Sequence, residues 1–355
     1  MKTHSPFSLL GFVVTCFMLF SSCEKQTQIR PNIVFLLADD LGYNELGSYG
    51  QKIIKTPHLD KLAKQSMRFT DFYAGNSVCS PSRAVLLTGV SSAYVPIRGN
   101  AGYFGKDDWS PTWLESNTFT FGELFKSAGY QSAFVGKWHL DNPDDISTWA
   151  CSHSFDFAAQ EQWTHRKSIR NFSKGGIWLN GDQKHFPYDF NNHECKDAFY
   201  TNFAIDFLDN KESDKPFFLF MSYRAPHSFE GPIRDTLDYV KRDWPKVEQA
   251  QAAKITLQDK QVGRLLDYLE SIGEMDNTIV MYTSDNGAHF GADGKGHQLE
   301  FFDSNGNLKG GKRDLYEGGV RVPLLVYWRN KITAGSVTDH ISAFQDLMPT
   351  FSEII

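Results

Sequence analysis

Short, continuous apolar runs recur along the chain, and segments with a helical spacing of apolar residues separate them. Runs of this kind, bounded by turn residues, are typical of strands in a mostly parallel sheet that is covered on both faces. We therefore expect strands at Asn32–Leu37, Gln131–Gly136, Pro216–Tyr223, Thr278–Ser284 and Pro323–Trp328.

Helices are expected between these strands. Thr56 can act as the N-cap of a helix that has Pro57 at its first position. A second helix is expected to run from Thr120 to Gly129 and a long one from about Val247 to Ile272. The alternation predicts an α/β fold with a large, mostly parallel or mixed central sheet flanked by helices on both faces.

The first residues carry a different pattern. The apolar run Ser8–Phe20 is short for a membrane span but suits the apolar region of an export signal. The letters LFSSC that follow resemble a bacterial lipobox whose Cys23 becomes lipidated; the alternative is an ordinary signal peptide cut near Ser22. We expect residues 1–22 to be a lipoprotein signal peptide, residues 23–30 a tether, and residues 31–355 one domain.

Composition narrows the class of protein. The chain is 41% hydrophobic and 14% aromatic, which is enough for a large core. A formal net charge of −6 offers no basic surface, so we do not expect a nucleic-acid partner. No cysteine pair has zinc spacing. With Cys16 in the signal and Cys23 lipidated, Cys79 is the odd one out and Cys151 and Cys195 could pair.

Hard oxygen donors follow two of the predicted strands. Asp39 and Asp40 come after the first strand, and Asp285 and Asn286 come after the fourth. One such pair would be ordinary turn chemistry. The carboxyl ends of strands in open α/β sheets, however, line the ligand crevice. Carboxylate and amide oxygens without histidine suit Ca²⁺ or Mg²⁺.

Cations and histidines occupy comparable positions. Lys137 and His139 follow the second strand, and His227 follows the third. With Arg83 and Lys312, these residues can clamp an anion and move protons near neutral pH. Each residue alone is more often an ordinary surface or core residue. Together with a divalent cation they indicate a site for an oxyanion ester.

The segment from Cys79 to Gly89 fits the spacing C-x-P-S-R-x-x-x-x-T-G, and on this motif the chain resembles the type I, formylglycine-dependent sulfatases. These are arylsulfatase-like members of the alkaline phosphatase superfamily. The segments NIVFLLADDLGYNELGSYG, GYQSAFVGKWHL, APH, TSDNG and LKGGKRDLYEGGVRVP resemble further motifs of the family. The resemblance implies an alkaline-phosphatase-like sulfatase fold and a sulfuric ester hydrolase of the EC 3.1.6 type.

The resemblance also implies a modified nucleophile. A maturing enzyme would read the proline and arginine in the unfolded chain and oxidise Cys79 to formylglycine (3-oxoalanine). One hydroxyl of the hydrated aldehyde would attack sulfur, and the other would lose its proton and expel sulfate. Because Ser80 and Pro81 mark a helix start, backbone amides there would favour negative charge.

Roles for the other residues follow from the same resemblance. One Ca²⁺ per chain, with Mg²⁺ as the alternative, would be held by Asp39, Asp40, Cys79, Asp285 and Asn286. The remaining catalytic residues would be Arg83 for steadying the formylglycine, Lys137 and Lys312 for the sulfate oxygens, His139 as the base, and His227 for the leaving oxygen.

The substrate is expected to be a sulfated carbohydrate or an aryl sulfate. The segment after the Thr-Gly lacks the histidines of the family, which concerns substrate contacts around Arg98 and Asn100. Aromatic and polar residues of the loop between Cys151 and Cys195 could either form a sugar subsite or simply pack on the core, and the sequence does not decide between these two interpretations. The loop residues concerned are Trp163, His165, Arg166 and Trp178.

Two other functions remain open: a phosphonate or phosphodiester hydrolase of the same superfamily, and a non-catalytic, sulfoglycan-binding lipoprotein. The N-terminus predicts an exported protein of a Gram-negative bacterium, periplasmic or associated with the outer membrane. The segment AFQDLMPTFSEII reads as an amphipathic helix cut off at Ile355. We therefore expect a truncated catalytic domain without the family's small C-terminal antiparallel subdomain. Arg313 stands where many relatives have glycine, although KRDLYEGG is familiar in sulfatases that act on carbohydrates.

Overall fold

The computed structural model describes Met1 and residues 30–103, 109–110, 112–161, 176–181, 183–189, 191–227, 237–291 and 296–355. The predicted signal peptide, nearly all of the tether with Cys23, and the candidate contacts Trp163, His165 and Arg166 lie outside the described residues. Within the described part of the chain, no helix combines the length and the apolar character that crossing a bilayer requires.

A ten-stranded sheet forms the centre of the fold, in the order β13-β2-β12-β11-β1-β10-β6-β7-β8-β9. Its five central strands, β11, β1, β10, β6 and β7, are parallel, and β12, β8 and β9 add antiparallel pairs on either side. This mixed sheet confirms the expected fold class. The strands are β1 (Asn32–Asp39), β2 (Met67–Phe69), β6 (Gln131–Lys137), β7 (Phe157–Glu161), β8 (Ile177–Leu179), β9 (Lys184–Phe186), β10 (Phe217–Pro226), β11 (Thr278–Ser284), β12 (Leu324–Trp328) and β13 (Val337–Thr338).

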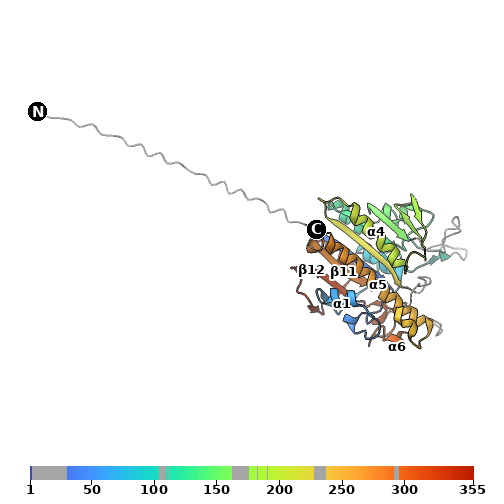
Figure 1. Cartoon of the computed structure of the whole chain (residues 1–355). Coiled ribbons are helices and arrows are strands. Elements are labelled where there is room, and N and C mark those ends of the chain that lie inside the picture. Colours follow the sequence, from blue (N-terminus) through green and yellow to red (C-terminus); the bar gives the residue numbers. More distant parts are fainter. Residues whose placement is uncertain are drawn as a thin grey trace.

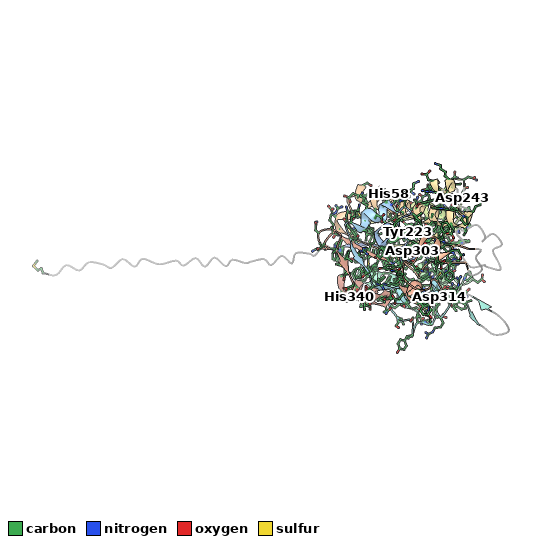
Figure 2. The ribbon with its side chains drawn as sticks, turned by 90° about the horizontal axis from the view of Figure 1, so that it is seen from below. His58, Tyr223, Asp243, Asp303, Asp314 and His340 are labelled. Atoms are coloured by element: carbon green, nitrogen blue, oxygen red, sulfur yellow. The ribbon has the colours of Figure 1, made fainter. Side chains whose placement is uncertain are left out.

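Helices cover both faces of this sheet (Figure 1). One face carries α1 (Pro57–Ala63), α4 (Lys196–Asn210) and α5 (Lys246–Ser271), and the other carries α2 (Cys79–Thr88), α3 (Phe121–Ser127) and α8 (Leu347–Ile354). Because alternate side chains of β1 enter opposite cores, with Val34 on the α5 side and Phe35 on the α2 side, the strand has to be apolar throughout. Side chains fill the space on both sides of the ribbon (Figure 2).

Short elements complete the described part of the chain. They are α6 (Leu299–Phe302), α7 (Glu317–Val320), the small strand pairs β3 (Phe72–Tyr73) with β14 (Ser342–Ala343) and β4 (Gly102–Tyr103) with β5 (Trp109–Ser110), and the 3₁₀ helices Gly47–Tyr49, Ile146–Thr148, Ala150–Ser152, Leu237–Lys241, Met275–Asn277 and Phe344–Asp346. The expected amphipathic helix near Ile355 is α8, which buries Leu347 and Phe351.

The helix starts are only partly as expected. Thr120 caps α3 in a capping box with Glu123, as its sequence predicts. Thr56 is the N-cap residue of α1 and Pro57 opens the helix, as expected, but the Thr56 side chain makes no capping hydrogen bond. Instead, the carboxylate of Asp259 in α5 accepts the backbone N–H groups of His58 and Leu59 at 3.2 and 2.7 Å. The cap of α1 is therefore a tertiary contact.

Candidate active site

Parallel pairing brings four strand ends to one edge of the sheet. Asp39 at the end of β1 lies opposite Pro226 of β10, and Ala38 lies opposite Ser284 of β11. The β6 strand, which ends at Lys137, pairs with β10 on its other side. The polar residues that follow these strands therefore converge, as the sequence predicts.

Three carboxylates and one thiol form a buried cluster at this edge. Ligand atoms of Asp39, Asp40, Asp285 and Cys79 all lie within 4.8 Å of one another. The backbone of Asp40 is left-handed (φ 71°), and its N–H donates to Asp285 Oδ1 at 3.1 Å. Burial raises the pKa of Asp285 to about 6 although Arg83 opposes this shift. Such crowding of acidic groups is what a divalent cation relieves.

Asn286 supplies a further donor to this cluster. Its Nδ2 donates to Asp40 Oδ1 at 2.8 Å, whereas its buried Oδ1 has no hydrogen-bond partner among the described residues. A buried acceptor is rarely left unpaired, because its desolvation then goes uncompensated. An amide oxygen beside three carboxylates fits the ligand set of Ca²⁺ or Mg²⁺.

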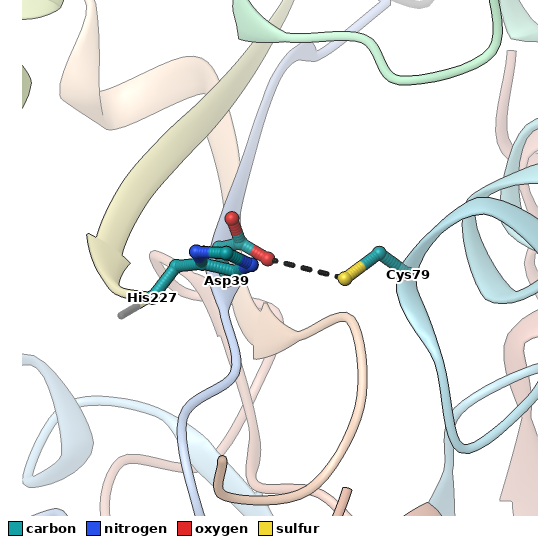
Figure 3. Close-up of side chains that lie close together, drawn as sticks. All are labelled: Asp39, Cys79 and His227. Carbon is teal, nitrogen blue, oxygen red and sulfur yellow. Dashed lines mark hydrogen bonds between the residues drawn. The ribbon is translucent and has the colours of Figure 1, made fainter. Parts of the chain in front are cut away.

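Cys79 is the first residue of α2 and is fully buried. Its Sγ lies 3.6 Å from Asp39 Oδ1 and 3.2 Å from Lys312 Nζ. Figure 3 shows the thiol directed from the helix toward Asp39. Burial raises the pKa of this thiol to about 12, although Lys137 and Lys312 act in the opposite direction. The thiol is therefore protonated at neutral pH and is a weak nucleophile.

The predicted cations surround the cluster. Lys137 Nζ contacts Asp39 at 2.7 Å, and Lys312 Nζ contacts Asp40 at 2.7 Å. Arg83, one turn along α2 from Cys79, binds Asp285 through Nε at 2.8 Å and the Lys137 carbonyl through Nη1 at 2.6 Å. Arg83 therefore fixes α2 to the ends of β11 and β6.

A fourth cation, Arg224, was missed in the sequence. It lies in β10 and donates from Nη1 to Asp39 Oδ2 at 3.1 Å, and its Nε is 3.7 Å from Glu161 at the end of β7. Burial disfavours ionisation of Asp39, but Lys137, His227, Arg83 and Arg224 hold its pKa well below the usual range. An arginine two residues from the end of a buried strand was the available signal, because a buried charge needs a partner.

Both predicted histidines are buried at the cluster. His139 has a left-handed backbone (φ 60°), and burial, Lys137 and Arg83 hold its pKa well below the ordinary value. His227 Nε2 lies 3.7 Å from Asp40 Oδ2, and its ring lies beside Asp39 in Figure 3. Burial lowers the pKa of His227 as well. Both rings are therefore neutral at neutral pH and able to accept a proton.

The weaker substrate-contact predictions fare differently. Arg98 donates to the carbonyls of Ser92 and Ala93 in its own loop, at 2.6 and 2.7 Å. The Trp178 ring in β8 packs at the sheet edge against Trp149 and His185. None of these contacts brings the side chain of Arg98 or Trp178 to the carboxylate cluster.

Asn100 and the remaining cysteines also take structural positions. The Oδ1 of Asn100 accepts the backbone N–H of Ser80 at 3.0 Å, so Asn100 supports the start of α2 directly after Cys79. No disulfide joins Cys151 to Cys195, so the pairing that the sequence left open is not formed.

Comparison with known proteins places these motifs in context. A family model described as Sulfatase matches residues 31–355. The chain is similar to N-acetylgalactosamine-6-sulfatase of Homo sapiens, with 32% identity over 90% of this chain and 61% of that protein. It is also similar to N-acetylglucosamine-6-O-sulfatase of Bacteroides thetaiotaomicron, with 27% identity over 99% of this chain and 72% of the relative.

A solved structure has the same fold. The crystal structure of Ps i-CgsB in complex with k-i-k-neocarrahexaose superposes with a TM-score of 0.75 at 28% identity, covering 92% of this chain and 72% of the other. The chain spans 61% of the length of the human relative.

Proposed function

The chain belongs to the sulfatase family, and from this premise we propose that it hydrolyses a sulfate ester of a glycan to an alcohol and inorganic sulfate. The observation that carries the proposal is the buried Cys79, held among three carboxylates and beside Lys312. Support for a glycan comes from the two relatives, which are named for 6-sulfated N-acetylhexosamines, and from the neighbour bound to neocarrahexaose.

Cys79 is, in this proposal, converted to formylglycine by a maturing enzyme. The support is the C-x-P-S-R motif together with the burial of a thiol whose pKa is about 12. A hydrated aldehyde supplies one hydroxyl that can take up the sulfuryl group and a second whose deprotonation releases sulfate without attack by water.

Asp39, Asp40, Asp285 and Asn286 are proposed to hold one Ca²⁺, with Mg²⁺ as the alternative. Their oxygens and the unsatisfied Asn286 Oδ1 fit such a cation. The cation supplies Lewis-acid polarisation of a sulfate oxygen when it is bound.

The side chains of the chain itself do the rest. Lys137 and Lys312 each donate toward the cluster, and both can bind sulfate oxygens as negative charge develops on them. His139 is neutral and can accept a proton at the nucleophile. To His227, whose neutral ring lies beside Asp40, we assign donation of its N–H to the leaving oxygen. Arg83 keeps the start of α2 aligned with Asp285.

We also propose that the chain is exported to the periplasm or outer membrane of a Gram-negative bacterium and is anchored through lipid on Cys23. The support is the N-terminal sequence alone. Metabolic labelling with a fatty acid tests this, because a Cys23→Ala chain should lose the label.

The function is tested on the whole chain produced together with a maturing enzyme. Mass spectrometry of the tryptic peptide Phe69–Arg83 should show the aldehyde in place of the thiol. The same sample should hydrolyse sulfate esters faster than phosphate monoesters and diesters, and Cys79→Ala should be inactive. Faster hydrolysis of phosphodiesters would favour the phosphonate or phosphodiester hydrolase. Glycan binding without turnover by a fully modified sample would favour the binding protein.

A further inference from the structure

Arg313 directly follows Lys312 and lies beside the segment that leads to the nucleophile. Its backbone N–H donates to the carbonyl of Ser77, two residues before Cys79, at 2.9 Å. The backbone of Arg313 is left-handed, with φ 81°. Consecutive side chains therefore diverge: Lys312 is buried and reaches Cys79, whereas the Arg313 side chain is exposed to solvent.

This conformation would favour glycine over arginine. A residue with a Cβ is disfavoured in the left-handed region by steric crowding, and glycine is not. A side chain kept under such strain beside a reaction centre indicates that it has a task there.

The guanidinium of Arg313 makes no polar contact within the described part of the protein. Neither a hydrogen bond nor an ion pair joins it to any described side chain, although the partly exposed Arg321 and Arg329 are both paired with carboxylates. The adjacent Asp314, labelled in Figure 2, accepts the backbone N–H of Gly311 at 3.0 Å instead. The charge of Arg313 is thus available to a ligand.

The charge of Arg313 also acts on His289, which lies near His227. His289 follows Asn286 in the loop after β11, and its ring centroid is 6.2 Å from that of His227. The pKa of His289 is lowered to about 4, mainly by burial and further by Lys312 and Arg313. The backbone N–H of Lys312 donates to the carbonyl of Ala288 at 2.9 Å, so the segments that carry Arg313 and His289 are neighbours, and His289 is next to His227. We assign the sugar to this region, outside the carboxylate cluster.

We propose that Arg313 determines specificity by binding a second anionic group, a carboxylate or a further sulfate, on the sugar that carries the scissile ester or on its neighbour. His289 lines the same region as a neutral hydrogen-bonding group. The inference rests on the proposed sulfatase function and narrows its substrate class to glycans with more than one anionic group near the ester.

Two substrates that differ by one anionic group test the inference. We would measure kcat/KM for 6-O-sulfated N-acetylglucosamine and for glucosamine N,6-O-disulfate with the wild-type chain and with Arg313→Gln. A charge-assisted hydrogen bond contributes about 1.5–3 kcal/mol, so kcat/KM for the disulfate should fall about 10- to 100-fold. The value for the monosulfate should stay within about 3-fold, because it does not use this contact.

Further variants separate charge from folding. Arg313→Gly suits the left-handed backbone and should show the same selective loss, whereas Arg313→Lys should restore part of it. Lys126→Gln removes an exposed cation of α3 near the start of β6, at the opposite edge of the sheet, and should change neither value. Added salt should reduce the wild-type preference for the disulfate, because the contact is exposed to solvent.

An equal loss on both sugars, or a loss on neither, would overturn the role of Arg313. Absence of turnover by the fully modified wild type is a different result, because it removes the proposed function. In that case calorimetry with Cys79→Ala still decides the inference: the disulfate should bind more tightly than the monosulfate, and Arg313→Gln should abolish the difference. Equal binding of the two sugars would refute it.

Discussion

Replacing Lys137 with methionine removes the cation closest to Asp39 and keeps most of the side-chain volume. Lys137 is fully buried at the end of β6, and its Nζ contacts both oxygens of Asp39, at 2.8 and 2.7 Å. Loss of one donor to developing negative charge lowers kcat by about 100- to 1,000-fold. We expect a loss of at least this size, because Lys137 carries a full charge and is fully buried.

Lys137→Met should affect the free energy of unfolding less than it affects kcat. Breaking a buried ion pair costs about 3–5 kcal/mol when the remaining charge is left alone. Asp39 is not left alone in Lys137→Met, because Arg224 remains at 3.1 Å and Arg83 at 3.7 Å. We therefore expect the free energy of unfolding to fall by less than the lower end of that range, about 3 kcal/mol.

Steady-state hydrolysis of an aryl sulfate and urea unfolding measure the two effects on one sample. Lys196→Met is the matched control, since Lys196 is also buried and paired with a carboxylate, Glu161 at 3.2 Å, but makes no contact with Asp39. Its kcat should stay within about 10-fold of the wild type. Near-normal turnover by folded Lys137→Met, or an equal loss in Lys196→Met, would refute the assignment of Lys137 to the sulfate.

Chelation, pH and the Arg224 pairs provide three further tests. Chelation of divalent cations should lower the melting temperature as well as the turnover, and Ca²⁺ should restore both, since a ligand at 100 times its Kd contributes about 2.7 kcal/mol; an unchanged melting temperature would contradict a bound cation. Burial raises the pKa of Asp259 to about 7, above the value of about 3.9 in an unfolded chain. The folded state therefore favours the protonated carboxyl, whose contribution to the free energy of unfolding is complete below about pH 4 and is lost as the pH rises through about 7. Asp259→Asn should therefore gain stability relative to the wild type between about pH 5 and about pH 8 in urea unfolding, by up to about 1.4 kcal/mol per unit of pKa shift; a constant difference would count against this. Arg224→Met removes a partner from both Asp39 and Glu161, although Lys137 and Lys196 remain beside them. It should therefore lower the free energy of unfolding in urea by more than Lys137→Met, which affects one carboxylate, whereas the exposed substitution Lys126→Gln should leave it nearly unchanged.

The convergence of the site residues could be predicted because it follows from one rule of sheet geometry. Parallel strands place their carboxyl ends at one edge, so the residues after β1, β6, β10 and β11 had to meet. The order of the strands could not be predicted in this way. The apolar run that became β12 has the same composition as the parallel strands, yet β12 pairs antiparallel with β11.

Tertiary partners explain what the sequence did not reveal. Thr56 has the local pattern of an N-cap, but the side chain that accepts the free N–H groups of α1 belongs to Asp259, about 200 residues away in the chain. Arg224 directly follows the apolar run Pro216–Tyr223, and only the neighbouring strands show that Asp39 and Glu161 compensate its charge. Local patterns describe single elements, whereas these contacts depend on how the elements pack.

The complete burial of α2 bears on when Cys79 can be modified. All ten residues of the helix are buried, from Cys79 to Thr88, so an enzyme cannot reach Cys79 once the chain has folded. In the proposed maturation, oxidation of this cysteine has to occur before the chain folds, so the two processes compete in each molecule. The active fraction of a preparation would then be set before folding, and later addition of the maturing enzyme should not raise it.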